Sequence, residues 1–316
     1  MRPRLTTDGA RACGLALAGL AAAAPGADGL ERVRLPDGRR LAMRCSGKGA
    51  PTVIMEAGFG GSSLAWARVQ ARVAKTTRVC AYDRAGYGLS DVGPMPRDGA
   101  AVVRDLDAAL KRARIKGPYV LVGHSAGGLY VRLFAARRRD DVVGMVLADP
   151  SIEHQDRRFA AVFGPGAGSL EGQRTRAARC LAATEARVSP QDPDYAACVS
   201  RATGQLHASG VWRTQMSEAE TLWGATSDQV DRIGDLLEAI PTIVLTAEAS
   251  QEGAAEPGRL QAQQLWSSLH REMAGRSLQG SVRKVDSSHM MMTDRPGVIA
   301  GAVEELVGRA RGETPG

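Results

Sequence analysis

The clearest chemical signal in the sequence is a serine between two glycines, in the run Gly123-His124-Ser125-Ala126-Gly127. The run follows an apolar stretch typical of a buried strand and precedes a stretch with helical spacing. In that context Gly-x-Ser-x-Gly exposes a nucleophilic serine on a tight turn, where side chains at the two glycines would clash. We therefore expect Ser125 to be the nucleophile, with the backbone N–H of Ala126, at the start of the helix, facing a developing oxyanion.

A serine hydroxyl is a weak nucleophile and needs a general base, for which histidine is the usual residue. Of the five histidines, His289 follows the last expected strand, where a loop can carry it to Ser125. Its position also agrees with the chain order nucleophile, acid, histidine. The other four are expected elsewhere: His124 in the turn with its side chain pointing away, His154 and His207 in an inserted region, and His270 on a surface-like helix.

The base in turn needs a carboxylate that fixes its tautomer and stabilises the imidazolium. Two candidates end consecutive apolar runs after the nucleophile, Asp149 first and Glu248 next. Both are able to reach the site, because both lie at the carboxyl ends of expected strands. We favour Asp149 and keep Glu248 as the alternative acid, since the segment 249–258 after Glu248 contains no aspartate.

A second oxyanion donor is expected from the loop Ala57-Gly58-Phe59-Gly60-Gly61, which follows the first core strand. The N–H of Phe59 is the expected donor, and Gly58 and Gly60 would let the backbone approach a substrate closely. The loop is not a dinucleotide fingerprint, because position 63 is serine where that pattern needs glycine. The sequence also lacks Walker, His-Glu-x-x-His and EF-hand motifs, so we expect neither a metal nor an organic cofactor.

These candidates lie at the ends of apolar runs that alternate with amphipathic helices. Such alternation is typical of an α/β fold with a mostly parallel, doubly wound sheet that is covered on both faces. A hairpin around Pro36-Asp37-Gly38 is expected before it. The expected strands are 52–57, 77–83, 119–125, 141–150, 240–248 and 281–286, and the expected helices are 64–74, 98–113, 126–139, 256–275 and 296–311.

Between residues 151 and 238 the strand pattern stops and polar, helical segments replace it. We interpret this stretch as a helical lid inserted into an α/β core formed by residues 29–150 and 239–316. Trp212 and Trp223 are expected to line an apolar acyl pocket under the lid.

Residues 1–28 have the pattern of a secretory signal peptide, with basic residues, a short alanine-rich apolar stretch and small residues suited to cleavage. Cleavage would remove Cys13 and leave an even number of cysteines, as an oxidising compartment favours. Among the possible pairings we choose Cys45 with Cys80 and Cys180 with Cys198. We therefore predict a secreted or periplasmic protein.

The net charge is +7 and the isoelectric point is near 9.5. Nearly all of the positive charge comes from arginine, is spread along the chain, and is accompanied by only 4% aromatic residues. A nucleic-acid partner is therefore not expected. No apolar stretch after the N-terminal segment is long enough to span a membrane, so stable membrane insertion is not expected either. A small molecule is the expected partner, and the oligomeric state stays open.

From about residue 30 to 310 the chain resembles enzymes of the α/β-hydrolase fold, through Gly-His-Ser-Ala-Gly-Gly and the late His289. The segments 56–66, 80–91 and 146–155 are similar to a bacterial group of often secreted hydrolases. The resemblance implies that Phe59 and Ala126 form the oxyanion hole. Some members of the fold carry the acid where Asp149 stands and others where Glu248 stands.

Three departures from the usual pattern of that fold are visible. The oxyanion loop has Glu56-Ala57 where histidine is frequent, and Ser288 precedes the base where glycine is common. Both leave the mechanism intact. The segment after Glu248 lacks the usual Gly-x-x-Asp, which weakens that acid position and favours Asp149.

Together these features predict a serine hydrolase that cleaves carboxylic esters through an acyl-enzyme, with a triad of Ser125, His289 and Asp149. The same site would also suit thioester or amide hydrolysis, acyl transfer, C–C cleavage or perhydrolysis, because a fold does not fix a reaction. The alternative outside the enzymes is a non-catalytic protein that binds a small apolar ligand. An ion pair between Asp83 and Arg84 is expected to fix the loop beside the oxyanion turn, with substrate binding by Arg84 as the alternative.

Overall fold

The computed structural model describes residues 29–186, 193–202, 205–251 and 258–313, so the predicted signal segment lies outside the described residues. Its centre is an eight-stranded sheet in the order β1-β2-β4-β3-β5-β6-β7-β8. The first three strands in this order pair antiparallel, and every later pair is parallel. The strands are β1 (Leu30–Arg34), β2 (Arg40–Ser46), β3 (Thr52–Glu56), β4 (Val79–Tyr82), β5 (Tyr119–His124), β6 (Val142–Ala148), β7 (Thr242–Ala249) and β8 (Gly280–Ser288).

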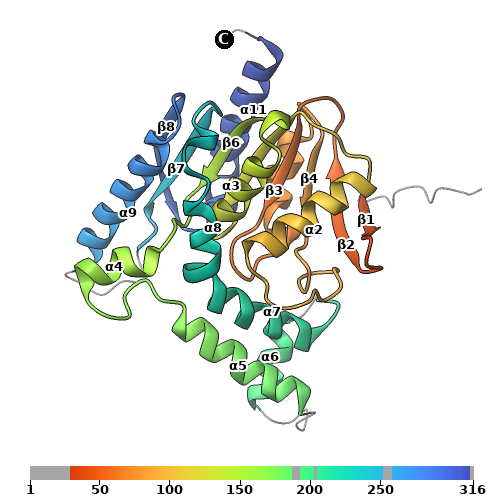
Figure 1. The fold of residues 1–316 in the computed structure, drawn as a ribbon, viewed down its shortest axis with the longest axis vertical. Helices are drawn as coiled ribbons and strands as arrows, with labels where there is room; N and C mark the ends of the chain where they lie inside the picture. Colours follow the sequence, from red (N-terminus) through yellow and green to blue (C-terminus); the bar gives the residue numbers. More distant parts are fainter. Residues whose placement is uncertain (1–28, 187–192, 203–204, 252–257, 314–316) are drawn as a thin grey trace, which may run out of the picture.

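Helices cover both faces of this sheet (Figure 1). They follow the amphipathic segments of the sequence. Asp98 caps the second of them, because its side chain accepts a hydrogen bond of 2.9 Å from the N–H of Ala101. The predicted core strands and helices are present, with ends that differ by a few residues. The core helices are α1 (Ala67–Val73), α2 (Gly99–Arg112), α3 (Gly127–Arg137), α9 (Gly258–Gly275), α10 (Met291–Asp294) and α11 (Pro296–Arg311).

Alternate residues of the buried strands supply two apolar cores, because successive strand side chains point to opposite faces. Ile54 of β3 packs in the core beneath α2, α3 and α9, whereas Val53 and Met55 pack in the core beneath α1 and α11. Both faces of β3 and β5 are fully buried, which explains their continuous apolar sequences. The carboxyl ends of the parallel strands therefore meet at one edge of a sheet that is held from both sides.

The residues between β6 and β7 form a helical insertion, and in its described part there is no strand, as the sequence predicts. In Figure 1 α5, α6 and α7 project beyond the sheet. The inserted helices are α4 (Gln155–Phe163), α5 (Glu171–Glu185), α6 (Pro193–Arg201), α7 (Ala208–Thr221), the π-helical turn η3 (Leu222–Thr226), α8 (Ser227–Asp231) and the short turn η4 (Gly234–Leu237).

The outer part of the insertion has a small core of its own, made of Ala177, Cys180, Cys198 and Trp212. A disulfide between Cys180 and Cys198 joins α5 to α6 at its centre. Trp212 is 3% exposed and packs against this disulfide. The expectation that Trp212 lines a substrate pocket is therefore wrong, because the outer helices need its ring to fill their own core.

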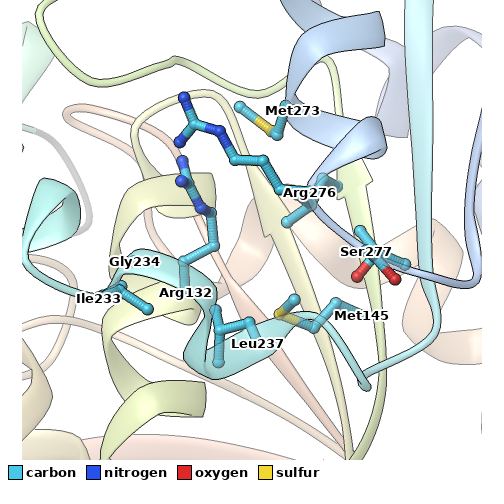
Figure 2. Close-up of a pocket in the computed structure, with 10 residues that line it drawn as sticks. Arg132, Met145, Ile233, Gly234, Leu237, Met273, Arg276 and Ser277 are labelled. Carbon is cyan, nitrogen blue, oxygen red and sulfur yellow. The ribbon is translucent and has the colours of Figure 1, made fainter.

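A small cavity of about 30 Å³ lies between α3, α9 and the turn η4. Figure 2 shows Arg132 and Arg276 at its rim. Both side chains pair with the carboxylate of Glu153, and the Arg132 contact is 2.7 Å. Such a space holds a water molecule or two but no substrate, so it is a packing feature tied by ion pairs.

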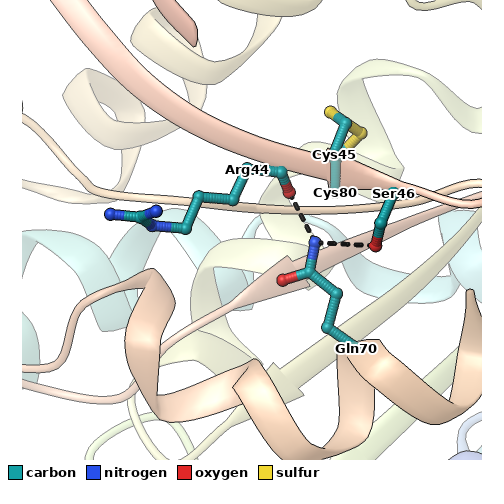
Figure 3. Close-up of a disulfide and its surroundings, with 5 residues drawn as sticks. All are labelled: Arg44, Cys45, Ser46, Gln70 and Cys80. Carbon is teal, nitrogen blue, oxygen red and sulfur yellow. Dashed lines mark hydrogen bonds between the residues drawn. A yellow bond between two sulfur atoms is a disulfide. The ribbon is translucent and has the colours of Figure 1, made fainter. Parts of the chain in front are cut away.

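The second disulfide, between Cys45 and Cys80, joins β2 to β4 at directly opposed positions (Figure 3). Beside it, the side-chain amide of Gln70 on α1 donates to the carbonyl of Arg44 at 2.7 Å and to the hydroxyl of Ser46 at 3.3 Å. Both disulfides join the cysteines that the sequence analysis pairs. They therefore fasten one edge of the sheet and the outer part of the insertion.

Within the described residues, no helix is both long enough and apolar enough to cross a bilayer.

Candidate active site

Ser125 lies on a tight turn between β5 and α3, with a left-handed backbone φ of 51°. Such a φ is strained for a residue with a side chain and marks an over-determined turn. A Cβ atom at Gly123 would lie 2.7 Å from the carbonyl oxygen of Gly127, and a Cβ at Gly127 would lie 2.6 Å from that of Glu56. Both flanking positions therefore require glycine, as the motif implies.

The loop after β3 passes directly over this turn. A Cβ atom at Gly58 would lie 3.0 Å from the Cβ of Ser125. Phe59 follows on this loop, and Phe59, Ser125 and Ala126 line the same pocket. Gly60, which has a φ of 71°, instead faces the side chain of Gln215 on α7. The two predicted oxyanion donors thus belong to the residues around the Ser125 hydroxyl.

His289, just after β8, lines the same pocket as Ser125. Its Nδ1 lies 2.6 Å from Oδ2 of Asp149, which follows β6. Asp149 is fully buried and has a left-handed φ of 44°. The structure therefore brings together all three residues that the sequence analysis favours for the triad.

The carboxylate of Asp149 receives donors on both oxygens. Its Oδ1 accepts from the N–H of Ala247 at 3.0 Å and from the indole N–H of Trp266 at 2.8 Å. Its Oδ2 accepts from the hydroxyl of Ser250 at 2.5 Å in addition to His289. Burial opposes ionisation of this group, but its hydrogen bonds and the nearby imidazoles outweigh burial and hold the pKa of Asp149 below its ordinary value.

Glu248, the alternative acid, is exposed at the end of β7. At the site β7 contributes a backbone group instead, the N–H of Ala247, which donates to Asp149. The carboxylate beside His289 is therefore that of Asp149.

Two histidines lie closer to the site than the sequence indicates. The ring of His124 does not point away: its Nε2 lies 2.8 Å from the carbonyl oxygen of His289, with the two ring centres 4.6 Å apart. Burial, followed by the charge of His289, lowers the pKa of His124 to about 3, so its ring is neutral. His270 is buried rather than on the surface, and its ring nitrogens contact the hydroxyl of Thr246 at 2.8 Å and the carbonyl of Pro150 at 2.9 Å.

Ser250 and Trp266 are residues that sequence reasoning misses. Ser250 follows β7 and Trp266 lies in the middle of α9, and both line the pocket while donating to Asp149. Neither belongs to a local motif. Their roles depend on how α9 packs against the sheet, so the sequence carries no direct signal for them.

Beneath the loop after β3, the expected oxyanion loop, lies Arg84, which is 1% exposed. Its guanidinium donates to the carbonyls of Ala57 at 2.7 Å and Gly58 at 2.9 Å. It also pairs with Glu56 at 2.7 Å and, on α7 of the insertion, with Glu218 at 2.9 Å. Burial disfavours the charged guanidinium, but the two carboxylates outweigh it and hold the pKa of Arg84 well above its ordinary value.

The expected ion pair between Asp83 and Arg84 is therefore not the one that the structure contains. Asp83 instead accepts from the backbone N–H groups of Ser63 at 2.7 Å and Leu89 at 2.9 Å. Both residues still shape the loops around the oxyanion turn, which is the role that the sequence analysis expects. Substrate binding by Arg84 does not fit its burial and its full set of partners.

The pocket that contains Ser125 has a volume of about 260 Å³. The inserted helices form part of its wall, through residues that include Trp223 of η3. Six neutral polar side chains besides the Ser125 hydroxyl also line it, so the wall differs from the apolar pocket expected from the sequence. In the part of the chain that the structure describes, no group of three or more His, Cys, Asp or Glu side chains is placed to bind a metal ion.

Known proteins resemble this chain in both sequence and fold. A model described as the alpha/beta hydrolase family matches residues 53–302. The uncharacterized protein YqjL of Bacillus subtilis is 37% identical over 106 residues, which make up 34% of this chain and 42% of YqjL. The chain thus spans less than half the length of the curated relatives that it matches.

Solved structures match more of the chain at lower identity. The enol-lactonase from Burkholderia xenovorans LB400 superposes with a TM-score of 0.62 at 20% identity, over 87% of this chain and 99% of that one. The thermophilic esterase from Thermogutta terrifontis gives a TM-score of 0.58 at 20% identity, over 89% and 98%. At this identity the likeness is one of fold.

Proposed function

The chain belongs to the alpha/beta hydrolase family, and from that premise we propose that it is a serine hydrolase that cleaves carboxylic esters. The observation that carries the proposal is the 2.6 Å contact between His289 and the buried Asp149, in a pocket that also holds Ser125 on its strained turn. A nucleophile, a base and a group that orients the base are the parts that such chemistry needs.

In the proposed reaction the Ser125 hydroxyl attacks the acyl carbon while Nε2 of His289 accepts its proton. Asp149 keeps the Nδ1–H tautomer of His289 and stabilises the imidazolium. The N–H groups of Phe59 and Ala126 receive the negative charge on the carbonyl oxygen. His289 then gives its proton to the leaving alcohol, and water releases the acid from the acyl-enzyme by the same steps.

Two similar structures, which are named as an enol-lactonase and an esterase, support ester substrates. We further propose that the inserted helices act as a lid, since they form part of the pocket wall. A secreted or periplasmic location remains part of the proposal: the N-terminal sequence pattern supports it, and two disulfides are compatible with it.

A fluorophosphonate probe, which reacts covalently with activated serines, tests the proposal directly. We expect labelling of the wild type, a mass increase on the peptide that contains Ser125, and no labelling of Ser125→Ala. An unlabelled but folded wild type would argue for a non-catalytic binding protein. Labelling without ester turnover would favour hydrolysis of a thioester, an amide or a C–C bond, or acyl transfer, over ester hydrolysis.

A further inference from the structure

The described wall of the Ser125 pocket is rich in neutral side chains that form hydrogen bonds. Among its described residues there is no lysine, arginine, aspartate or glutamate, although the chain has 41 Lys and Arg and 34 Asp and Glu in all. Among these described residues a charged group of a substrate would find no side chain of fixed charge to pair with, and an unpaired charge is costly to take out of water. The neutral polar residues of the wall are Ser151, Gln155, Ser169, Gln173, Ser250 and Gln251.

Two residues of this wall each have a buried polar side-chain atom with no hydrogen-bond partner among the described residues. The two atoms are the side-chain carbonyl oxygen of Gln155, at the start of α4, and the indole N–H of Trp223 in η3. The first is an acceptor and the second is a donor only. Leaving buried polar groups unpaired costs free energy. Both atoms are buried, so a ligand with an O–H and an oxygen acceptor pairs with them only when the side chain rotates toward the pocket. The Gln155 amide can turn toward such a ligand, because its last side-chain torsion is soft.

Aromatic rings complete the wall. Phe59, Trp223 and Trp266 line the same pocket, and flat rings pack well against C–H groups. A wall that combines amides, hydroxyls and aromatic rings matches a carbon chain that carries hydroxyl groups, since such a chain presents C–H and O–H groups side by side. A purely apolar chain would leave the amides of the half-buried Gln155 and Gln251 desolvated and unpaired.

On the basis of the proposed ester hydrolysis, we infer that the pocket selects an uncharged ester that carries hydroxyl groups over an apolar ester of the same size. The hydroxyl groups belong to either half of the ester, a polyol alcohol or a hydroxy acid. A substrate with a free carboxylate is the poorest of the three classes.

Matched esters test this inference. Glycerol monoacetate against propyl acetate probes the alcohol side, ethyl 3-hydroxybutanoate against ethyl butanoate probes the acyl side, and monoethyl succinate supplies the charged case. Released acid is followed by titration at constant pH. We expect kcat/KM to favour the hydroxylated ester in at least one pair by about tenfold, as one or two hydrogen bonds allow, and to be lowest for monoethyl succinate. A preference for the apolar ester in both pairs would overturn the inference.

Variants then assign the preference to the wall. Gln155→Leu and Gln173→Leu keep side-chain bulk but remove the amide, so each should reduce kcat/KM for the hydroxylated ester more than for its apolar partner. Gln279→Leu is the matched control, because Gln279 is exposed between α9 and β8 and should leave the ratio unchanged. If neither pocket variant changes the ratio, the glutamines do not select the substrate.

Binding to Ser125→Ala separates this inference from the proposed reaction. Trp223 and Trp266 line the pocket, so ester binding should change tryptophan fluorescence without any turnover. A wild type that hydrolyses no ester while Ser125→Ala still binds the hydroxylated member more tightly would refute the reaction and keep the selectivity. Equal affinities within each pair would refute the selectivity, whether or not the enzyme turns over.

Discussion

The carboxylate of Asp149 lies 2.6 Å from Nδ1 of His289, although 140 residues separate them in the chain. Asp149 follows β6 and His289 follows β8, the strands on either side of β7. Because these strands are parallel, their carboxyl ends meet at one edge, and Ser125 after β5 joins them there. The arrangement of the candidate triad is thus a property of the sheet.

Replacing the acid should remove most of the activity. Asp149→Asn keeps the shape of the side chain but offers His289 a donor or a neutral acceptor, so turnover should fall by about 10⁴. Glu248→Gln, at the exposed alternative position, should stay within about twofold of the wild type, as surface changes usually do. The kcat values of the two variants for a p-nitrophenyl ester decide whether Asp149 or Glu248 is the acid. Loss of activity in Glu248→Gln together with an active Asp149→Asn would reverse the assignment.

Trp266 should act through Asp149. Trp266→Phe keeps an aromatic ring but removes the N–H that donates to Oδ1 of Asp149 at 2.8 Å. A hydrogen bond to a charged group contributes about 1.5–3 kcal/mol, so kcat should fall by roughly tenfold or more. The readout that separates positioning from simple packing is a double-mutant cycle with Asp149→Asn. In that background Trp266→Phe should have little further effect on kcat, whereas independent losses that multiply would contradict the positioning role.

Arg84 should couple the insertion to the oxyanion loop. Its fork of donors reaches two loop carbonyls and two buried carboxylates, which a lysine cannot match. Arg84→Lys should therefore destabilise the fold, by about 3–5 kcal/mol if the buried pairs are broken. Glu218→Gln, the milder change, keeps the contacts to the loop carbonyls and should lower kcat less than Arg84→Lys at equal fractions folded. Urea unfolding measures the stability of each variant, and active-site titration gives kcat per folded enzyme. An equal kcat per folded site in the wild type, Arg84→Lys and Glu218→Gln would show that Arg84 stabilises the fold without positioning the loop.

Glu153 should make part of the stability depend on acid pH. Burial opposes its ionisation, but Arg132 and Arg276 outweigh burial and lower the pKa of Glu153 from 4.5 to about 2. A lowered pKa means that the carboxylate stabilises the fold above about pH 4.5 and loses this contribution as the pH falls toward 2. Its linkage contribution at neutral pH is about 3 kcal/mol.

Glu153→Gln should therefore lower the free energy of unfolding in urea clearly at pH 7 and much less near pH 2. The matched control is Glu171→Gln, which removes an exposed pair with Arg174 and should unfold like the wild type. An identical loss at both pH values would mean that Glu153 contributes by packing and not by its charge.

Local signals predicted the parts of the site that depend on local structure. The turn at Ser125 needs glycine on both sides for steric reasons, so a short motif identifies it. Asp149 and His289 could be predicted because the carboxyl ends of parallel strands lie together. The roles of Trp266, Ser250 and the buried His270 could not be predicted, since each depends on packing between distant elements. Trp212 was misplaced for the same reason: nothing local indicates that it fills the core around the Cys180–Cys198 disulfide.

The most direct test of the proposed reaction is a rapid-mixing experiment with a p-nitrophenyl ester. The account predicts a burst of p-nitrophenol that approaches one equivalent per folded enzyme if deacylation limits turnover, and an acyl group on Ser125 in protein quenched with acid. Ser125→Ala should show neither, with turnover lower by about 10⁴ or more. A Ser125→Ala protein that hydrolyses the ester at the wild-type rate, or an acyl group on another residue, would contradict the assignment.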